Sequence, residues 1–179
     1  MIFHETKLKG AFVVEPERIE DERGFFSRNW SQREFAAQGL NDTFVESNTS
    51  LSQKKGTLRG MHFQAAPHAQ VKLVRCTQGA VYDVVIDLRA DSPTFKQWVA
   101  VELTAANGRL LYVPQGFAHG FQTLVADTEV FYLVSAYYAP ESAGGVRWND
   151  PVFAIQWPED SRTIIERDRD YPDFDPAAR

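Results

Sequence analysis

The chain has 179 residues, and its 13 Phe, 6 Tyr and 4 Trp provide enough apolar material for one substantial core. It carries 24 acidic and 19 basic residues, and the resulting net charge of −5 argues against a nucleic-acid-binding surface. No apolar run approaches the roughly 20 residues that cross a bilayer, and no leader pattern stands at the N-terminus. We therefore expect a cytoplasmic protein without membrane contact. We also expect a single domain over 1–179, whose core runs from about residue 10 to 172.

Residues 11–38 open with short apolar runs that are broken by turn signals. The first run ends at Glu15-Pro16, and an Asp-Glu-Arg-Gly turn at 21–24 precedes the second. Ser31 and Glu34 then form a capping-box pattern, and Gly39 stands where a helix would end. The sequence therefore predicts a short helix over 32–38.

Residues 43–138 have the pattern of strands. Short β-branched and aromatic runs recur about every ten residues, with turn signals at 54–56, 77–79, 91–93, 107–108 and 114–116. Asn107-Gly108 predicts a hairpin between 99–103 and 109–113. The stretch 81–88 alternates, so that 82, 84, 86 and 88 share one face and 81, 83, 85 and 87 the other. This spacing favours an all-β sandwich or jelly roll.

The chain after residue 138 is mostly loop and turn material. Thr163 and Glu166 form a second capping-box pattern, which predicts a short helix that ends at Pro172, and residues 173–179 are expected to fray. Cys76, the single cysteine, lies in an apolar run and is expected to be a small buried hydrophobe.

Two stretches, 56–79 and 108–123, resemble the two halves of the cupin signature. Gly56, His62 and Gly79 keep the spacing of the first half, but Gln64 and Lys72 stand where metal-binding cupins have a histidine and a glutamate. An ammonium repels a divalent cation and an amide is a poor substitute for imidazole, so we expect no bound metal. The resemblance implies an all-β, cupin-type jelly-roll barrel with a few short helices at its periphery.

Seven motifs in register resemble the dTDP-4-dehydrorhamnose 3,5-epimerase family, the metal-free cupin enzymes of deoxysugar biosynthesis. They lie at 21–26, 58–64, 72–75, 82–89, 92–95, 114–121 and 148–151. The resemblance implies a homodimer without a cofactor that acts on a nucleotide-diphosphate-linked 4-keto-6-deoxyhexose and inverts C3, C5 or both through an enolate.

The resemblance also implies the catalytic residues. His62 is expected to be the base and Tyr132 the acid on the opposite face of the sugar, while Lys72 stabilises the enolate oxygen. A carboxylate that orients the base falls on Asp168, although Asp170 lies close by. His62, Lys72 and Tyr132 together speak against a binding protein without turnover, because binding alone requires neither base nor acid.

The remaining predicted residues bind substrate. The resemblance places the diphosphate on Arg59, His119 and Arg23, with Arg23 reaching into the partner subunit's site, and it places an aromatic that stacks on the base at Tyr138. Asn48 and Arg167 complete the predicted binding residues, together with the pair discussed next.

Arg28 and Glu46 stand where the family usually has Glu and Gln, at positions that read the nucleobase. The substitution leaves GDP- or CDP-linked sugars open beside dTDP, which the resemblance favours. A single-carbon epimerase and a ketoisomerase on the same scaffold also stay open.

Strand alternation places Arg59 and His62 on opposite faces of one strand, although the resemblance implies that both side chains belong to the same site. Gly60 lies between them, and a β-bulge at this glycine would turn Arg59 to the face of His62.

Overall fold

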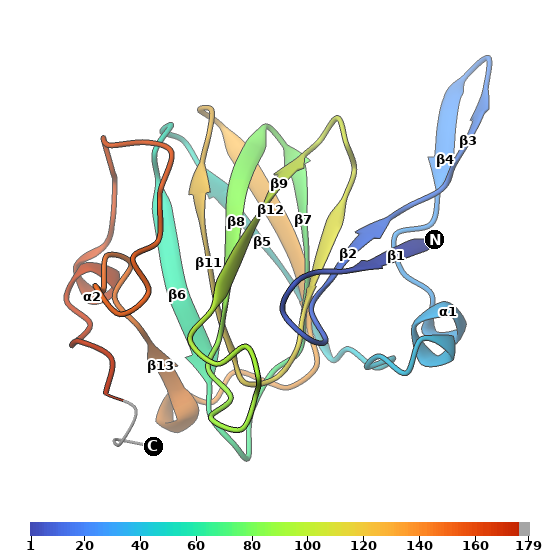
Figure 1. Ribbon diagram of the computed structural model, residues 1–179. Helices are drawn as coiled ribbons and strands as arrows, with labels where there is room; N and C mark the ends of the chain where they lie inside the picture. The colour runs from blue at the N-terminus through green and yellow to red at the C-terminus, as the bar shows by residue number, and fades with distance from the viewer. Residues whose placement is uncertain (176–179) are drawn as a thin grey trace.

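The computed structural model describes residues 1–175, which form a sandwich of two antiparallel sheets (Figure 1). One sheet has six strands in the order β1-β2-β10-β7-β12-β5 and the other has five in the order β13-β6-β11-β8-β9. The strands of the six-stranded sheet are β1 (Ile2–Glu5), β2 (Phe12–Glu15), β5 (Glu46–Ser52), β7 (Lys72–Gln78), β10 (Leu110–Val113) and β12 (Thr128–Val134). Those of the five-stranded sheet are β6 (Leu58–Gln64), β8 (Ala80–Asp87), β9 (Trp98–Thr104), β11 (Phe117–Thr123) and β13 (Ala143–Gly145). The jelly-roll prediction is confirmed.

The main core fills the space between the two sheets. The alternation predicted for 81–88 is confirmed, because Val81 and Val85 of β8 join this core while Val84 and Ile86 pack on the outer face of the five-stranded sheet. Cys76 is buried in the same core, as expected. The outer face of the five-stranded sheet is covered by loop residues such as Phe153 and by the C-terminal segment, which keeps that segment close to β6.

The helix α1 (Gln32–Ala37) buries Phe35 against the outer face of the six-stranded sheet. The predicted helix is confirmed, but the capping box is wrong, because the Ser31 side chain makes no capping hydrogen bond. The Glu34 carboxylate instead accepts from the amino group of Met1 at 2.8 Å and from Arg28 at 3.3 Å. Two cations offer Glu34 stronger, charge-assisted bonds than a backbone N–H does.

The C-terminal helix α2 (Glu166–Arg169) is shorter than predicted and starts later. Thr163 does not cap it, because Thr163 pairs with Thr57 in an isolated bridge, and the N-cap position falls on Ile165. The expected fraying is wrong for 173 and 174: Asp173 accepts a hydrogen bond from Arg147, and the Phe174 ring packs 5.1 Å from that of Phe153. Residues 176–179 lie outside the described residues.

The hairpin predicted at Asn107-Gly108 is wrong. A turn is present, since Asn107 Oδ1 accepts from the backbone N–H groups of Thr104 and Arg109, but it connects β9 to β10, which lie in different sheets. The turn chemistry is local, whereas the pairing of the strands is decided by which sheet buries their side chains.

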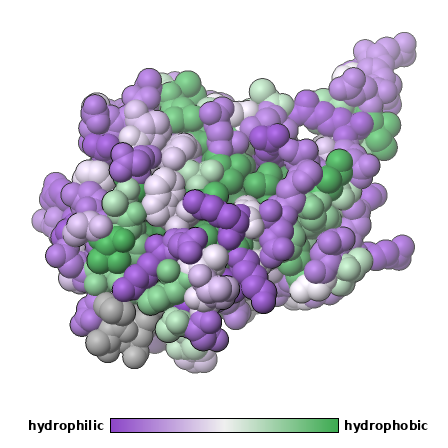
Figure 2. Space-filling model, in the orientation of Figure 1, coloured by the Kyte–Doolittle hydropathy of each residue, from purple (hydrophilic) through white to green (hydrophobic). Residues whose placement is uncertain are grey.

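Strands β3 (Arg18–Asp21) and β4 (Gly24–Ser27) form a separate two-stranded hairpin that projects from the sandwich as an arm (Figures 1 and 2). Ile19, Phe25 and Phe26 are exposed on it. The remaining short element is a 3₁₀ turn, η1 (Pro140–Ser142), and in the described part of the chain no helix is long and apolar enough to cross a membrane.

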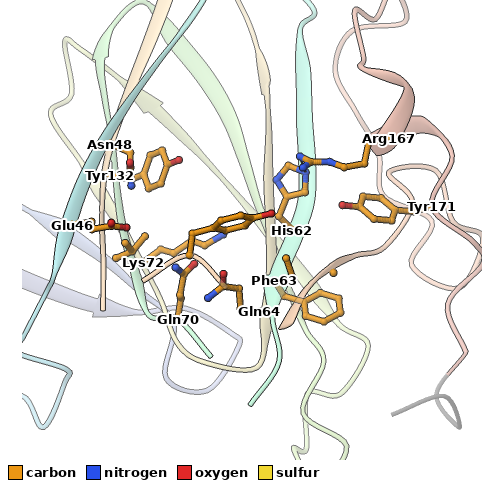
Figure 3. A pocket seen from close by; sticks show the side chains of 14 residues that line it. Glu46, Asn48, His62, Phe63, Gln64, Gln70, Lys72, Tyr132, Arg167 and Tyr171 are labelled. Atoms are coloured by element: carbon orange, nitrogen blue, oxygen red, sulfur yellow. Dashed lines mark hydrogen bonds between the residues drawn. The ribbon is translucent and has the colours of Figure 1, made fainter. Parts of the chain in front are cut away.

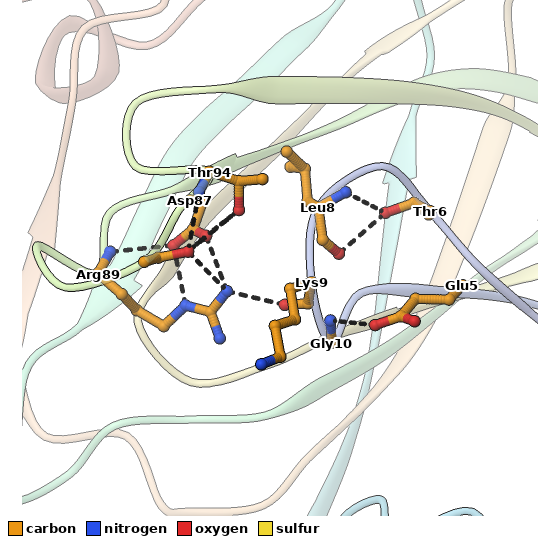
Figure 4. A network of polar contacts seen from close by, with 9 residues as sticks. Glu5, Thr6, Leu8, Lys9, Gly10, Asp87, Arg89 and Thr94 are labelled. Carbon is orange, nitrogen blue, oxygen red and sulfur yellow. Dashed lines mark hydrogen bonds and ion pairs between the residues drawn. The ribbon is translucent and has the colours of Figure 1, made fainter.

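A buried carboxylate ties the loop after β8 to the N-terminal turn (Figure 4). Asp87 accepts hydrogen bonds from Arg89, Ser92 and Thr94, and Arg89 donates onward to the carbonyl oxygen of Lys9 at 2.7 Å. Burial opposes its ionisation, but these bonds outweigh burial and lower the pKa of Asp87 to about 2. This network lies outside the cavities described next.

Candidate active site

A cleft opens between the two sheets and consists of two adjoining cavities of about 280 and 410 Å³. Both cavities are lined by His62, Lys72, Tyr132 and Arg167. Figure 3 shows Tyr132 and Lys72 on the side of the six-stranded sheet, and His62 and Arg167 on the side of β6 and the C-terminal segment. The combined size suits a ligand larger than a free monosaccharide.

Strand alternation explains the wall formed by the six-stranded sheet. Tyr132 and Val134 of β12 point inward, and the register places Lys72 of β7 beside Val134. Glu46 and Asn48 are two residues apart on β5 and line one cavity with them. No side-chain hydrogen bond reaches the Lys72 ammonium from the described residues; burial lowers its pKa to about 8, against an opposing attraction from Asp83.

The bulge predicted at Gly60 is confirmed and sets the opposite wall. His119 pairs with His62 while Phe121 pairs with Arg59, so β6 carries one residue more than β11 between these pairs. Gly60 has φ = +135°, and a Cβ there would lie 2.5 Å from Gly120 Cα. Only glycine fits this close approach, which lets Arg59 and His62 line the same cavity.

His62 is held by a buried carboxylate from the far end of the chain. Its Nε2 lies 2.8 Å from Oδ1 of Asp168, which is 1% exposed and also accepts from the backbone N–H of Gly60 at 3.1 Å. Burial opposes the ionisation of Asp168, but hydrogen bonds from His62 and Gly60 keep its pKa below the ordinary value. Asp170 is instead exposed and bonded to Arg169, so the structure places Asp168 at this position.

Burial lowers the pKa of His62 despite the nearby carboxylate, and the positive charges of Lys72 and Arg167 act in the same direction. A neutral imidazole that donates its Nε2–H to Asp168 has its lone pair on Nδ1. Burial raises the pKa of Tyr132 on the other wall, so its phenol keeps its proton. Proton transfer at a carbon beside a ketone requires a base, an acid on the opposite side and a cation near the ketone oxygen, and side chains with this chemistry line the cleft.

The positions of the cupin metal motif have other contacts here. The Gln64 side chain donates to the carbonyl oxygens of His68 and Tyr137 and accepts from the N–H of Ala139, so it anchors a loop. His119 is bonded to Asp83 at 2.5 Å. Residues 1–175 contain no group of three His, Cys, Asp or Glu side chains arranged to hold a metal ion.

Comparison with known proteins identifies the family. The family profile described as dTDP-4-dehydrorhamnose 3,5-epimerase matches residues 5–176. The chain is 48% identical to the Salmonella typhimurium dTDP-4-dehydrorhamnose 3,5-epimerase over 88% of this chain and 86% of that protein. The chain belongs to the dTDP-4-dehydrorhamnose 3,5-epimerase family.

Solved structures agree with this membership. The Bacillus anthracis dTDP-4-dehydrorhamnose 3,5-epimerase, with TDP and PPi bound, superimposes with a TM-score of 0.93 at 46% identity, covering 97% of this chain and 99% of the other. A 3'-monoepimerase from Streptomyces bikiniensis in complex with dTDP-quinovose superimposes at 0.88 with 33% identity, covering 95% and 86%.

The structure brings ten of the twelve predicted site residues of this epimerase family member to the cleft. They are His62, Tyr132, Lys72, Asp168, Glu46, Asn48, Arg59, His119, Tyr138 and Arg167. Arg23 and Arg28 do not line the cleft of their own chain. Arg23 stands on the projecting arm and pairs with Asp21, and Arg28 pairs with Glu34.

The sequence analysis missed two residues of functional interest, one that lines the cleft and one that lies behind a cleft residue. The Tyr171 ring lies edge-on to His62, with ring centroids 6.3 Å apart, and its position three residues after Asp168 is the signal that could have indicated it. The other is Asp83, whose carboxylate on the inward, apolar face of β8 was visible in the alternation but was not linked to His119.

Proposed function

We propose that this protein inverts C3 and C5 of a dTDP-linked 4-keto-6-deoxyhexose. The observation that carries this proposal is the placement of His62 and Tyr132 on opposite walls of one cleft with Lys72 lining the same space. The relative with TDP bound supports the thymidine nucleotide. The 3'-monoepimerase among its relatives makes inversion at C3 alone the second candidate.

In each inversion, Nδ1 of His62 takes the proton from the carbon next to the C4 ketone. The electron pair of the broken C–H bond forms the enolate, whose C4 oxygen is stabilised by the Lys72 ammonium. Tyr132 then donates its phenolic proton to the opposite face of the same carbon, and the ketone re-forms. Solvent afterwards accepts the proton from His62 and returns one to Tyr132, so the enzyme ends the cycle unchanged.

Turnover in D₂O tests this assignment. Wild-type enzyme should place deuterium at both C3 and C5, observed by NMR, whereas a 3-epimerase would label C3 alone. Tyr132→Phe should still allow wash-in of deuterium from the His62 face while the inverted product falls about 10²–10⁴-fold. Equal loss of exchange and inversion in Tyr132→Phe would contradict the acid role.

We also propose a homodimer in which Arg23 and Arg28 serve the cleft of the other copy. Both residues lie outside their own cleft, and Arg23 is on an arm with exposed apolar side chains. Arg23→Ala and His62→Ala should each be inactive alone. After unfolding and refolding as a mixture, about a quarter of the wild-type sites should return, because half the dimers are mixed and one of their two sites is intact. No recovery in a mixture shown to contain mixed dimers would contradict a shared site.

A further inference from the structure

Asp83 is a buried charge next to the cleft, bonded to the cavity residue His119, and the mechanism above gives it no role. It is fully buried on β8, and its Oδ1 accepts a hydrogen bond from His119 Nε2. Its Oδ2 is buried without a hydrogen-bond partner among the described residues. A buried carboxylate with an unpaired oxygen is costly, and such a cost is typical of a functional site.

The surroundings of Asp83 connect it to the residues that carry out the reaction. His119, its hydrogen-bond partner, lines the same cavity as Lys72, and the carboxylate of Asp83 attracts the Lys72 ammonium. The two groups form no direct ion pair, so this attraction acts through the low-dielectric interior of the barrel, where it is screened less than in water. The other titratable or charged groups that line the cavities with Lys72 are Glu46, Arg59, His62, His119, Tyr132, Tyr138, Arg167, Asp168 and Tyr171.

We infer that Asp83 is a positioning residue of the proposed epimerase: one oxygen fixes the ring of His119, and the buried negative charge keeps Lys72 an ammonium at neutral pH. Lysine must be charged to stabilise the enolate oxygen, yet burial in the cleft drives it toward the neutral form. The negative charge of Asp83 opposes this effect of burial without contacting the substrate. A direct ion pair would instead engage the ammonium that has to stabilise the enolate oxygen. This inference rests on the proposed function for its catalytic consequence, but the charge state of Lys72 can be measured without turnover.

Asp83→Asn is the informative change, because the amide oxygen can still accept from His119 while the charge is lost. The ammonium is followed by NMR of ¹³Cε-labelled lysine, with the Lys72 signal assigned by its loss in Lys72→Arg. The wild-type signal should titrate near pH 8, and in Asp83→Asn it should titrate about one unit lower. The basic limb of kcat/KM should move with it, so that activity falls about fivefold at pH 8 and less than twofold at pH 6.

Asp87→Asn is the matched control, since Asp87 is the other fully buried carboxylate of β8 and its partners lie outside the cleft. It should leave the Lys72 titration unchanged even if it lowers the melting temperature. Should Asp83→Asn not fold, Asp83→Glu keeps the charge and should keep the titration of Lys72 within about 0.3 units of wild type.

An unchanged Lys72 titration in Asp83→Asn, or a downward shift of a full unit in Asp83→Glu, would overturn the inference. So would a uniform loss of activity at every pH, which indicates a structural role only. A shifted lysine titration in a protein without epimerase activity would instead refute the proposed function and leave the electrostatic role of Asp83 in place.

Discussion

Replacing Asp168 by Asn tests the link between the C-terminal segment and the base. The three groups that face the carboxylate are all donors: His62 Nε2 and Arg167 Nε at Oδ1, and the backbone N–H of Gly60 at Oδ2. An amide has one acceptor oxygen and one NH₂ group. If the oxygen stays on Gly60, the NH₂ faces His62 and forces the imidazole to place its proton on Nδ1.

This change of tautomer removes the lone pair that takes the substrate proton. Because a positioned base contributes about 10²–10⁴-fold, kcat should fall by about 10²–10³-fold while KM changes little. The alternative orientation of the amide leaves the Gly60 N–H without its acceptor. A buried donor of this kind costs about 1–3 kcal/mol, so a variant in that orientation should keep the tautomer of His62 but lose about that amount in the free energy of unfolding.

Single-turnover exchange at C3 and C5 in D₂O measures the chemical step, and urea unfolding measures stability. Asp170→Asn is the matched control, because Asp170 is exposed and bonds only to Arg169 among the described side chains. It should behave as wild type in both assays. If Asp168→Asn exchanges deuterium at the wild-type rate without any loss of stability, or if Asp170→Asn loses as much activity, then the Asp168–His62 bond does not set the tautomer of the base.

Four further outcomes are expected. The acid limb of the pH profile of kcat/KM should lie below pH 6.5, because burial lowers the pKa of His62. The basic limb should lie near pH 8, where Lys72 loses its proton. A profile of kcat/KM that is flat from pH 5 to 9 would contradict both roles. Since folded His62 binds its proton less readily than the unfolded chain does, its contribution to stability is complete above about pH 6.5 and is lost as the pH falls. Gly60→Ala should decrease the free energy of unfolding by about 2–5 kcal/mol, because the new methyl group meets Gly120. In Gly39→Ala nothing lies within 4 Å of the new methyl group, so this substitution should cost only about 1 kcal/mol. Equal losses of stability in urea unfolding would contradict the steric argument for Gly60. Calorimetry should show dTDP binding at least about tenfold more tightly than GDP, CDP or UDP, and a preference for GDP or CDP would overturn the choice of nucleotide.

The parts of this protein that were read correctly from its sequence are those with a local signal. Strand alternation around Val84, the bulge at Gly60 and a lysine within an apolar strand are properties of a few neighbouring residues, and the structure contains each of them. The capping boxes failed for the opposite reason, because contacts between distant residues replaced the local ones. Glu34 and Thr163 had local partners available but formed contacts with Met1 and Thr57, which are distant in the chain.

By itself, the sequence determined the all-β character and the residue types that stand at the cupin motif positions, because hydrophobic period and side-chain chemistry are local. Only the tertiary structure decided which groups meet. It brings Asp168 to His62 across 106 positions, pairs Asp83 with His119 between neighbouring strands, and sends the chain across to the other sheet at Asn107. These contacts follow from how the two sheets and the C-terminal segment bury their apolar faces together, and that burial is a property of the whole chain rather than of any short stretch of it.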